Sequence, residues 1–514
     1  MISSRHARLV LPFLALLSQC REATGRNTLQ YYFSYDPRSL DPALSSDVPS
    51  GQMVSLLFDN LTQFDPDGRL QPGLATRWEP DRQGLVYTFH LRRGVRFHDG
   101  RPLVARDVRE SFRRALSPLT KGGRAWPLFP IRGARSYAAG ADTGVGVAAP
   151  DDSTVVVTLE SPLNFFPMLL AMPVAAVVPT PTAPDFDQQP VGSGPWTFVA
   201  WSHDDQLLLA RYAGYWGEAP RSDSLRIRII PEPLTQAAEY ESGRLSVLEV
   251  PLGETRLWEA NRAAELQRRN SLRILYIALN TTRGPLRDVR VRRALNHAVD
   301  VPTILDRLMG GRGTLAAGAL APGLPGYDSS RERYRYDPGL ARRLLAEAGY
   351  PDGFAVQLWR GQLPGYSRVA QAVQQDLAAV GVKVEIVERD YASARAAAWK
   401  GEADLFLTEW YADYPDAENF NFPLFHSSNR GAGANYAFLE DSILDALIVR
   451  ARSTPDLQEK ERLDRTIDAR IFDEAPWIFC WFVTDLWAVQ PNLQGWTVPA
   501  IFTGQRWQSA VHTR

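Results

Sequence analysis

Alternation of apolar and polar residues predicts β-structure through much of the first half of the chain. In GLVYTFHLRRGVRFHDG (84–100) the alternation ends at an Asp-Gly pair, which is typical of a β-hairpin or meander. Helical spacing of apolar residues follows in VARDVRESFRRAL (104–116) and predicts an amphipathic helix. Further apolar runs predict strands in STVVVTLE (153–160), VGSGPWTFVAW (191–201) and LRIRII (225–230). The front half is therefore expected to be rich in β-structure.

From about residue 270 the pattern changes to alternating strands and helices. RILYIALNTT (273–282) predicts a strand, and Asp288 is placed to cap the helix that follows it. The clearest helix lies within YDPGLARRLLAEAGYPDGF (336–354), where Asp337 precedes a proline at the first turn and Gly349 marks the end. Together with the β-rich front, this pattern predicts a mixed α/β protein.

The first twenty residues have the character of an export signal. Two arginines precede a short apolar run (9–17) that is too short to span a bilayer, so residues 1–20 are predicted to be a secretory signal peptide. The run ends in Leu-Ser-Gln-Cys, which resembles the lipobox of bacterial lipoproteins and makes Cys20 the candidate lipidation site. Gln19 departs from that pattern, because a small residue normally precedes the cysteine.

The second of the two cysteines and the most apolar internal stretch are both expected in the core. Cys480 lies in WIFCWF and is predicted to be a buried, unreactive thiol, so the exported chain has no disulfide. Residues 163–179 are interrupted by Pro167 and Pro173, which favours a buried helix followed by a strand over a membrane span.

Composition narrows the class of protein. A chain of 514 residues is too long for one hydrophobic core, so two or three lobes are expected. The formal net charge is −1 and no basic block stands out, which argues against a nucleic-acid partner. The 14 Trp, 18 Tyr and 22 Phe residues either fill a large core or line a cleft for an organic ligand.

Signatures of catalysis and of metal binding are missing from the sequence. It contains no HExxH, CxxC or GxxxxGK[ST] motif, and its seven histidines are scattered, so no metal or cofactor is predicted. Ser193 in VGSGPW resembles a nucleophile elbow only superficially, because Val191 and Pro195 stand where that motif needs glycines. The chain is therefore not expected to be an enzyme, and an exported hydrolase is the weakest alternative.

One segment, EWYADYPDAENF (409–420), combines four carboxylates with four aromatic rings and contains no cation. A cleft that encloses a cationic ligand group must offer a carboxylate, because an unpaired buried ammonium is very costly. Aromatic rings beside that carboxylate would exclude water and add cation–π attraction. The alternative is that the acids cap turns and the rings pack in the core.

Five stretches, taken together and in order, resemble one family. They are 73–116, VGSGPWTFVAW with its downstream Tyr-Trp, LNTTRGPLRDVRVRRALNHAVD, the helix of 336–354 and EWYADYPDAENF. They resemble the extracytoplasmic solute-binding proteins of peptide-type ABC importers, the oligopeptide- and dipeptide-binding family (bacterial solute-binding family 5). The stretches cover nearly the whole chain after the export segment.

This resemblance implies an α/β, bilobed periplasmic-binding-protein clamshell with an additional smaller lobe. By analogy, main lobe I combines residues 26–46, 190–270 and 480–514. The extra lobe spans 47–189 and main lobe II spans 271–479. Ligand would lie between the main lobes, and hinge closure would enclose it.

In the peptide-binding relatives, the Asp of a matching W-x-x-D-Y stretch anchors the ligand's amino terminus. That position is Asp413 here, with Trp410, Tyr411 and Tyr414 as candidate walls of the cleft. Asn435 and Tyr436 follow soon after and are further candidates. The residue that binds the ligand's carboxylate is not placed.

The resemblance also implies partners and a location. A short peptide would be captured in the periplasm or cell envelope and delivered to membrane permeases driven by ATPase subunits, with a monomer as the default state. The first alternative is the same fold with a non-peptide solute, such as a nickel complex, a sugar or an opine. The second is an envelope sensory or chaperone-like protein without a transport role.

Overall fold

The computed structural model describes residues 27–122, 124–141, 144–362, 365–431 and 433–513. The predicted signal peptide (1–20) and Cys20 therefore lie outside the described residues. Within the described ranges, no helix is both long enough and apolar enough to cross a membrane.

The first lobe is built on a four-stranded sheet in the order β1-β10-β9-β8. Strands β8 (Trp196–Ser202) and β9 (Gln206–Arg211) form an antiparallel hairpin, and most of β8 lies within the strand predicted from residues 191–201. β10 (Ser224–Ile229) pairs antiparallel with β9 and parallel with β1 (Thr28–Phe33). The sheet thus joins segments that are almost 200 residues apart in the sequence.

The extra lobe holds a second four-stranded antiparallel sheet in the order β4-β5-β7-β6. Its helix α2 (Ala105–Leu116) buries Val108, Phe112 and Leu116, the residues that define its predicted apolar face. The remaining elements are β2 (Thr62–Phe64), β3 (Leu70–Pro72), β4 (Ala75–Pro80), β5 (Val86–Leu91), β6 (Val147–Asp151), β7 (Thr154–Thr158), α1 (Val48–Leu57), α3 (Ala134–Ala138) and α4 (Phe166–Leu169).

Two local expectations for this lobe need correction. The alternating stretch 84–100 does not fold back on itself as a full hairpin: β5 pairs with β4 and β7, and a single bridge, Arg96–Pro102, closes the turn. Residues 163–179 form only the four-residue helix α4 and a short 3-10 turn, without a strand, because Pro167 and Pro173 interrupt the backbone pattern.

The second lobe contains a larger sheet in the order β11-β17-β12-β16-β14-β15, with β13 added on β17. Its strands are β11 (Val247–Glu249), β12 (Leu266–Leu279), β13 (Gly313–Leu315), β14 (Ala355–Gly361), β15 (Lys383–Arg389), β16 (Leu405–Tyr411) and β17 (Trp477–Val489). The helices around it are α7 (Val289–Ala298), α8 (Val301–Met309), α9 (Pro338–Glu347), α10 (Tyr366–Ala378), α11 (Tyr391–Trp399), α12 (Glu418–Phe425), α13 (Ser442–Ser453) and α14 (Leu457–Glu474).

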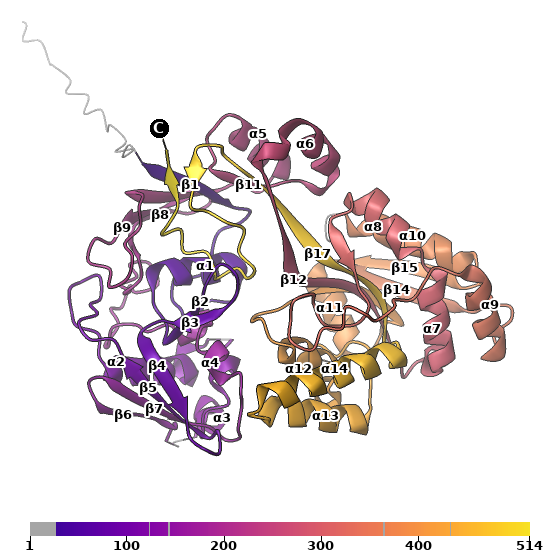
Figure 1. Cartoon of the computed structure of the whole chain (residues 1–514), viewed down its shortest axis with the longest axis horizontal. Coiled ribbons are helices and arrows are strands. Elements are labelled where there is room, and N and C mark those ends of the chain that lie inside the picture. The colour runs from indigo at the N-terminus through magenta and orange to yellow at the C-terminus, as the bar shows by residue number, and fades with distance from the viewer. Residues whose placement is uncertain (1–26, 123, 142–143, 363–364, 432, 514) are drawn as a thin grey trace, which may run out of the picture.

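Two long strands, β12 and β17, connect the lobes (Figure 1). They pair with each other along most of their length, with a register irregularity between Asn270 and Ile274. The boundaries expected near residues 270 and 480 fall inside these two strands. Helices α5 (Pro233–Glu241) and α6 (Thr255–Arg262) cover the top of the molecule in Figure 1, and β18 (Leu493–Gln494) pairs with β19 (Val511–His512) near the C-terminus.

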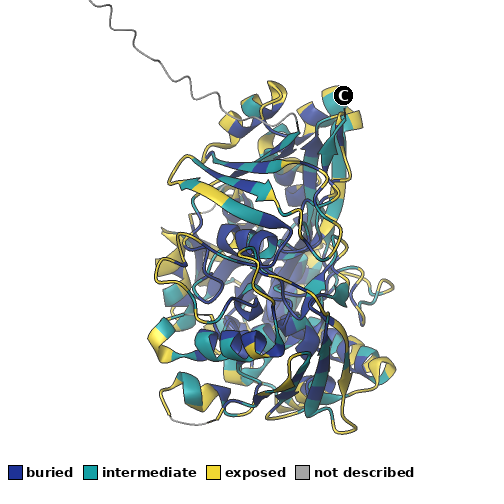
Figure 2. Ribbon diagram, turned by 90° about the vertical axis from the view of Figure 1, so that its left-hand side faces the viewer, coloured by how far each residue is buried: buried dark blue, intermediate teal, exposed yellow. Residues whose placement is uncertain are grey.

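Buried residues run through the strands and inner helix faces, and exposed residues gather on outer loops (Figure 2). Cys480 lies in this interior with 2% of its surface exposed, as predicted. Burial raises the pKa of its thiol to about 12, so the reactive thiolate is disfavoured.

The VGSGPW stretch owes its glycines to close backbone contact with the end of α1. A Cβ on Gly192 would stand 1.8 Å from the carbonyl oxygen of Leu57, and one on Gly194 would stand 2.6 Å from that of Leu56. Any larger residue would push α1 away from the first lobe. The motif is therefore a packing surface, which agrees with the absence of a nucleophile elbow.

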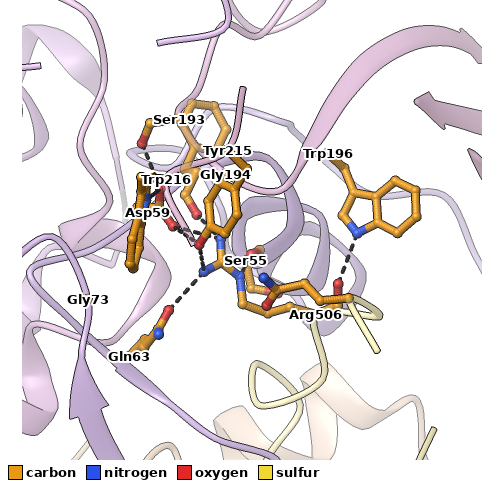
Figure 3. A network of polar contacts seen from close by, with 12 residues as sticks. Ser55, Asp59, Gln63, Gly73, Ser193, Gly194, Trp196, Tyr215, Trp216 and Arg506 are labelled. Carbon is orange, nitrogen blue, oxygen red and sulfur yellow. Dashed lines mark hydrogen bonds and ion pairs between the residues drawn. The ribbon is translucent and has the colours of Figure 1, made fainter. Parts of the chain in front are cut away.

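That packing surface surrounds a buried ion pair between Asp59 and Arg506 (Figure 3). The pair is 2.8 Å long, and Asp59 also accepts hydrogen bonds from Ser193 Oγ (3.0 Å), Tyr215 Oη (3.2 Å) and Trp216 Nε1 (2.8 Å). The network joins the extra lobe, which supplies Asp59, to three segments of the first lobe. It gives the family-like Tyr-Trp pair downstream of VGSGPW a structural role.

Candidate functional site

A cavity of about 740 Å³ lies between the lobes, within the range of about 300–1,000 Å³ typical of small-molecule sites. Its walls come from the end of β1, the start of α1, the segment after β11, and strands β12, β16 and β17. The start of α10 and the C-terminal segment 496–507 complete it. Every lobe therefore contributes to the same enclosed space.

Aromatic side chains are concentrated on this cavity. Nine of its lining residues are aromatic: Tyr31, Tyr32, Phe33, Tyr35, Tyr411, Trp487, Trp496, Phe502 and Trp507. Only Tyr411 was among the sequence candidates. The others lie close to the two ends of the chain and meet because β1 and the C-terminal segment both pack in the first lobe.

Charged side chains line another part of the cavity, and those on the long strands pair with one another. Arg273 on β12 forms an ion pair of 3.1 Å with Asp485 on β17. Arg312 lies 3.7 Å from Glu249 and donates to the carbonyl oxygen of Val250 (2.6 Å). These charges are therefore compensated within the protein.

Burial changes the titration of these groups. Burial raises the pKa of Asp485 to about 6, although Arg273 works in the opposite direction. Burial disfavours the charge on Arg273, but Glu409 and Asp485 outweigh it and raise the Arg273 pKa above its ordinary value. Glu409 also accepts a hydrogen bond from the Tyr366 hydroxyl.

The alternation of β16 divides the predicted site residues between two faces. Glu409 and Tyr411 line the cavity, whereas Trp410 packs on the opposite face against the large core that contains Tyr414. Pairing with β12 continues beyond β16, because the Ala412 N–H donates to Leu272 O (3.0 Å). Asp413 follows directly after this pairing, at a bend of the chain beyond the end of β16.

Asp413 is a partly buried carboxylate without a partner in the described part of the chain. Its side chain accepts no hydrogen bond and forms no ion pair there, while its backbone N–H donates to Asn419 Oδ1 (3.0 Å). Burial raises the pKa of Asp413, and Arg124 opposes the shift. Asp413 is not one of the residues that line the 740 Å³ cavity; it lies two positions beyond Tyr411.

The remaining candidates have structural contacts. Tyr414 is buried, stacks on Phe165 of the extra lobe with ring centroids 5.7 Å apart, and donates to Glu418. Asn435 is buried and bonds with its side chain to both backbone groups of Leu439 (3.0 and 3.2 Å). Tyr436 packs edge-on against Phe406. None of these three side chains lines the cavity.

Glu418, from the same acidic segment, is held in the core beside α13. Its carboxylate forms an ion pair of 3.0 Å with Arg452, and only 4% of the residue is exposed. Burial raises the pKa of Glu418 from 4.5 to about 6, while Arg452 and Tyr414 lower it. The segment therefore places some of its acids in the core.

Stability is expected to increase as the pH falls from 7 to 5, with Glu418 as one cause. Because its folded pKa is raised, this stabilisation is fully present below about pH 4.5 and is lost as the pH rises through about 6. Denaturation of Glu418→Gln and of the unaltered chain at pH 5 and pH 7 checks this. The free energy of unfolding should rise from pH 7 to pH 5 in both proteins, and this rise should be about 1 kcal/mol smaller in Glu418→Gln. An equal pH dependence in both proteins would contradict it.

Within the described residues, no group of three or more His, Cys, Asp or Glu side chains is arranged to hold a metal ion. The cavity instead offers apolar rings, compensated ion pairs and Arg368, and the carboxylate of Asp413 follows two positions after the cavity-lining Tyr411. Such a site can bind an amphipathic organic ligand that carries a cationic group. Two lobes connected by long strands around such a cavity define a bilobed ligand-binding protein.

Comparison with known proteins identifies the family. Residues 69–432 match the family described as "Bacterial extracellular solute-binding proteins, family 5 Middle", and the chain belongs to this family of binding proteins. It is 31% identical over 486 residues to heme-binding protein A of Haemophilus influenzae, covering 89% of this chain and 87% of that one. The fold and the family predicted from the sequence are thereby confirmed.

Two further proteins are similar to this chain. The glutathione-binding protein GsiB of Pectobacterium atrosepticum is 32% identical over 455 residues, which cover 86% of each chain. The periplasmic binding protein DppA of Helicobacter pylori, solved in complex with the peptide STSA, has a TM-score of 0.79 and 25% identity. That match covers 95% of this chain and 98% of DppA.

Proposed function

We propose that this protein is the substrate-binding component of an ABC importer and that its ligands are short peptides. The observation that carries the proposal is Asp413, a partly buried carboxylate without a partner in the described residues, two positions beyond Tyr411, which lines the aromatic cavity between the lobes. A peptide's α-ammonium is the natural counter-charge for such a group. Peptide and glutathione binding in similar proteins support the same class of ligand, since glutathione is itself a tripeptide.

The mechanism is capture and closure without covalent chemistry. Asp413 and Tyr411 would contact the amino end of the peptide, and the remaining cavity walls would enclose the rest. Trp410, Tyr414, Asn435 and Tyr436 are not part of this proposal, because their contacts hold the scaffold behind the site. Movement about β12 and β17 would bring the lobes together and create the surface that the permease recognises.

Location and partners complete the proposal. Residues 1–20 would direct export, and Cys20 would carry a lipid anchor in the mature monomer. Membrane permeases and their ATPase subunits would take up the ligand from the closed form.

Native mass spectrometry of the chain lacking residues 1–20, followed by denaturation, tests the ligand class. We expect copurified short peptides that leave the protein on denaturation. A sugar, metal chelate or heme as the released ligand would overturn the peptide proposal and leave the family assignment intact. Chemical change of a bound peptide during incubation would overturn the binding-only mechanism.

A further inference from the structure

Four aromatic residues on the cavity wall form a closed ring of contacts, here called the aromatic quartet: Tyr31, Trp487, Trp496 and Trp507. The ring centroids of Tyr31 and Trp507 are 4.9 Å apart, and those of Tyr31 and Trp487 are 6.4 Å apart. Trp496 closes the ring, at 5.5 Å from Trp487 and 5.8 Å from Trp507. Three separate segments of the chain therefore build one continuous apolar surface.

The quartet is supported from behind and accessible in front. Trp496 and Trp507 are each 4% exposed and belong to the core of the first lobe. Tyr31 and Trp487 are only half-buried and pack against that core. Because the two buried rings hold the two accessible ones, the surface is rigid before ligand arrives, which lowers the entropic cost of binding.

Most charges of the cavity already have partners within the protein, whereas Arg368, which also lines the cavity, has none among the described residues. Arg273 pairs with Asp485 and Arg312 with Glu249, so these four groups already satisfy one another. No such ion pair involves the quartet, which offers apolar ring surface and one buried donor without a partner in the described residues, Trp496 Nε1. The charged part of the cavity and the aromatic quartet together favour an amphipathic ligand whose apolar part lies against the quartet.

We propose that the ligand is a peptide with a bulky apolar side chain, best an aromatic one, that packs against the aromatic quartet. This inference rests on the proposed function and narrows it. It predicts selection by side chain in addition to anchoring of the amino terminus. Trp487 and Tyr31 are then the residues that determine specificity.

Calorimetric titration with four tripeptides tests the inference. The peptides are Ala-Ala-Ala and its three variants with one Phe, so that the Phe visits each position. We expect the best-placed Phe to strengthen binding by about tenfold or more over Ala-Ala-Ala, since a buried aromatic side chain removes much apolar surface from water. In Trp487→Leu that ratio should fall to about twofold.

The control variant is Trp78→Leu, which removes another half-buried tryptophan, on β4 and away from the cavity. Trp78→Leu should keep the tenfold or greater preference for the best Phe peptide over Ala-Ala-Ala. Tyr31→Leu provides a second variant in case Trp487→Leu fails to fold, and thermal unfolding of each protein establishes folding. A variant that merely loses stability binds all four peptides less well, so its ratio of affinities for the best Phe peptide and for Ala-Ala-Ala stays the same.

Each other result has a distinct meaning. Equal binding of all four tripeptides would overturn the inference and keep the proposed function, whereas no binding of any peptide would overturn both. If Trp487→Leu and Tyr31→Leu both kept the preference for the best Phe peptide over Ala-Ala-Ala, the apolar subsite would lie elsewhere and the role of the quartet would be overturned. Tighter binding of glutathione, which has no ring, than of every Phe peptide would also overturn it.

Discussion

Replacement of Arg506 by methionine is expected to destabilise the protein by about 3–5 kcal/mol, because it leaves the buried Asp59 carboxylate without its cation. Asp59 is 1% exposed at its side chain and Arg506 is 9% exposed. Methionine fills similar apolar volume, so the loss reports the uncompensated charge rather than a large cavity.

The size of the effect follows from how completely Arg506 is used. Besides Asp59, its guanidinium donates to the carbonyl oxygens of Ser55 (2.7 Å) and Phe58 (3.0 Å), to Gln63 Oε1 (2.8 Å) and to Tyr215 Oη (3.0 Å). Burial acts to lower the Arg506 pKa, but Tyr215 and Asp59 raise it above its ordinary value. All these acceptors would lose a partner in a buried or partly buried position.

Urea denaturation, followed by tryptophan fluorescence, measures the loss. The control is Arg77→Met, which removes the exposed ion pair with Glu79, whose side chains are 61% and 63% exposed; it should cost at most about 1 kcal/mol. If Arg506→Met cost no more than this control, the network would not be what holds the extra lobe to the first lobe.

Replacement of Asp413 by asparagine is expected to weaken the binding of unblocked peptides by about 10- to 100-fold. Asparagine keeps the size of the side chain and removes the charge. A hydrogen bond to a charged group contributes about 1.5–3 kcal/mol, and the enclosed ammonium of the ligand would lose its counter-charge. The folded protein should tolerate the change, because the carboxylate has no partner in the described residues and burial already raises its pKa.

Titration with a peptide and its N-acetylated form separates the role of Asp413 from a general loss of affinity. Acetylation should weaken binding to the unaltered chain and have little effect on Asp413→Asn, because both changes remove the same interaction. Glu402→Gln changes an exposed acid that precedes β16; it is the control and should bind normally. Unchanged affinity of Asp413→Asn for the true ligand would favour a non-peptide solute.

Local sequence signals predicted helices and their ends well. Asp337 accepts a hydrogen bond from Leu340 N at the start of α9, Asp288 accepts one from Arg290 N at the start of α7, and Gly349 has a φ of 92° just after α9. Such caps depend on residues within one turn of each other, so they are visible in the sequence. In the stretch 84–100, β5 pairs with the strand directly before it, β4, and with the distant strand β7, which no local signal names, so the expected hairpin is reduced to the single bridge Arg96–Pro102.

Of the predicted site residues, only Tyr411 lines the cavity, for a related reason. The acidic aromatic segment drew attention to Asp413, Trp410, Tyr411 and Tyr414 together, but β16 turns alternate residues to opposite faces. A strand pattern tells which residues share a face; it does not tell which face meets the cavity. Pairing with β12 decides that, and it directs Trp410 and Tyr414 to the core.

By itself, the sequence determined the class of fold, the family and the positions of the main helices, because these depend on local periodicity and on motifs that can be matched in order. Only the tertiary structure decided which residues meet at the cavity. Tyr31 and Trp507 stand near opposite ends of the chain and have ring centroids 4.9 Å apart. Their contact arises from the packing of β1 and the C-terminal segment into one lobe, a long-range burial of apolar surface that has no local signature.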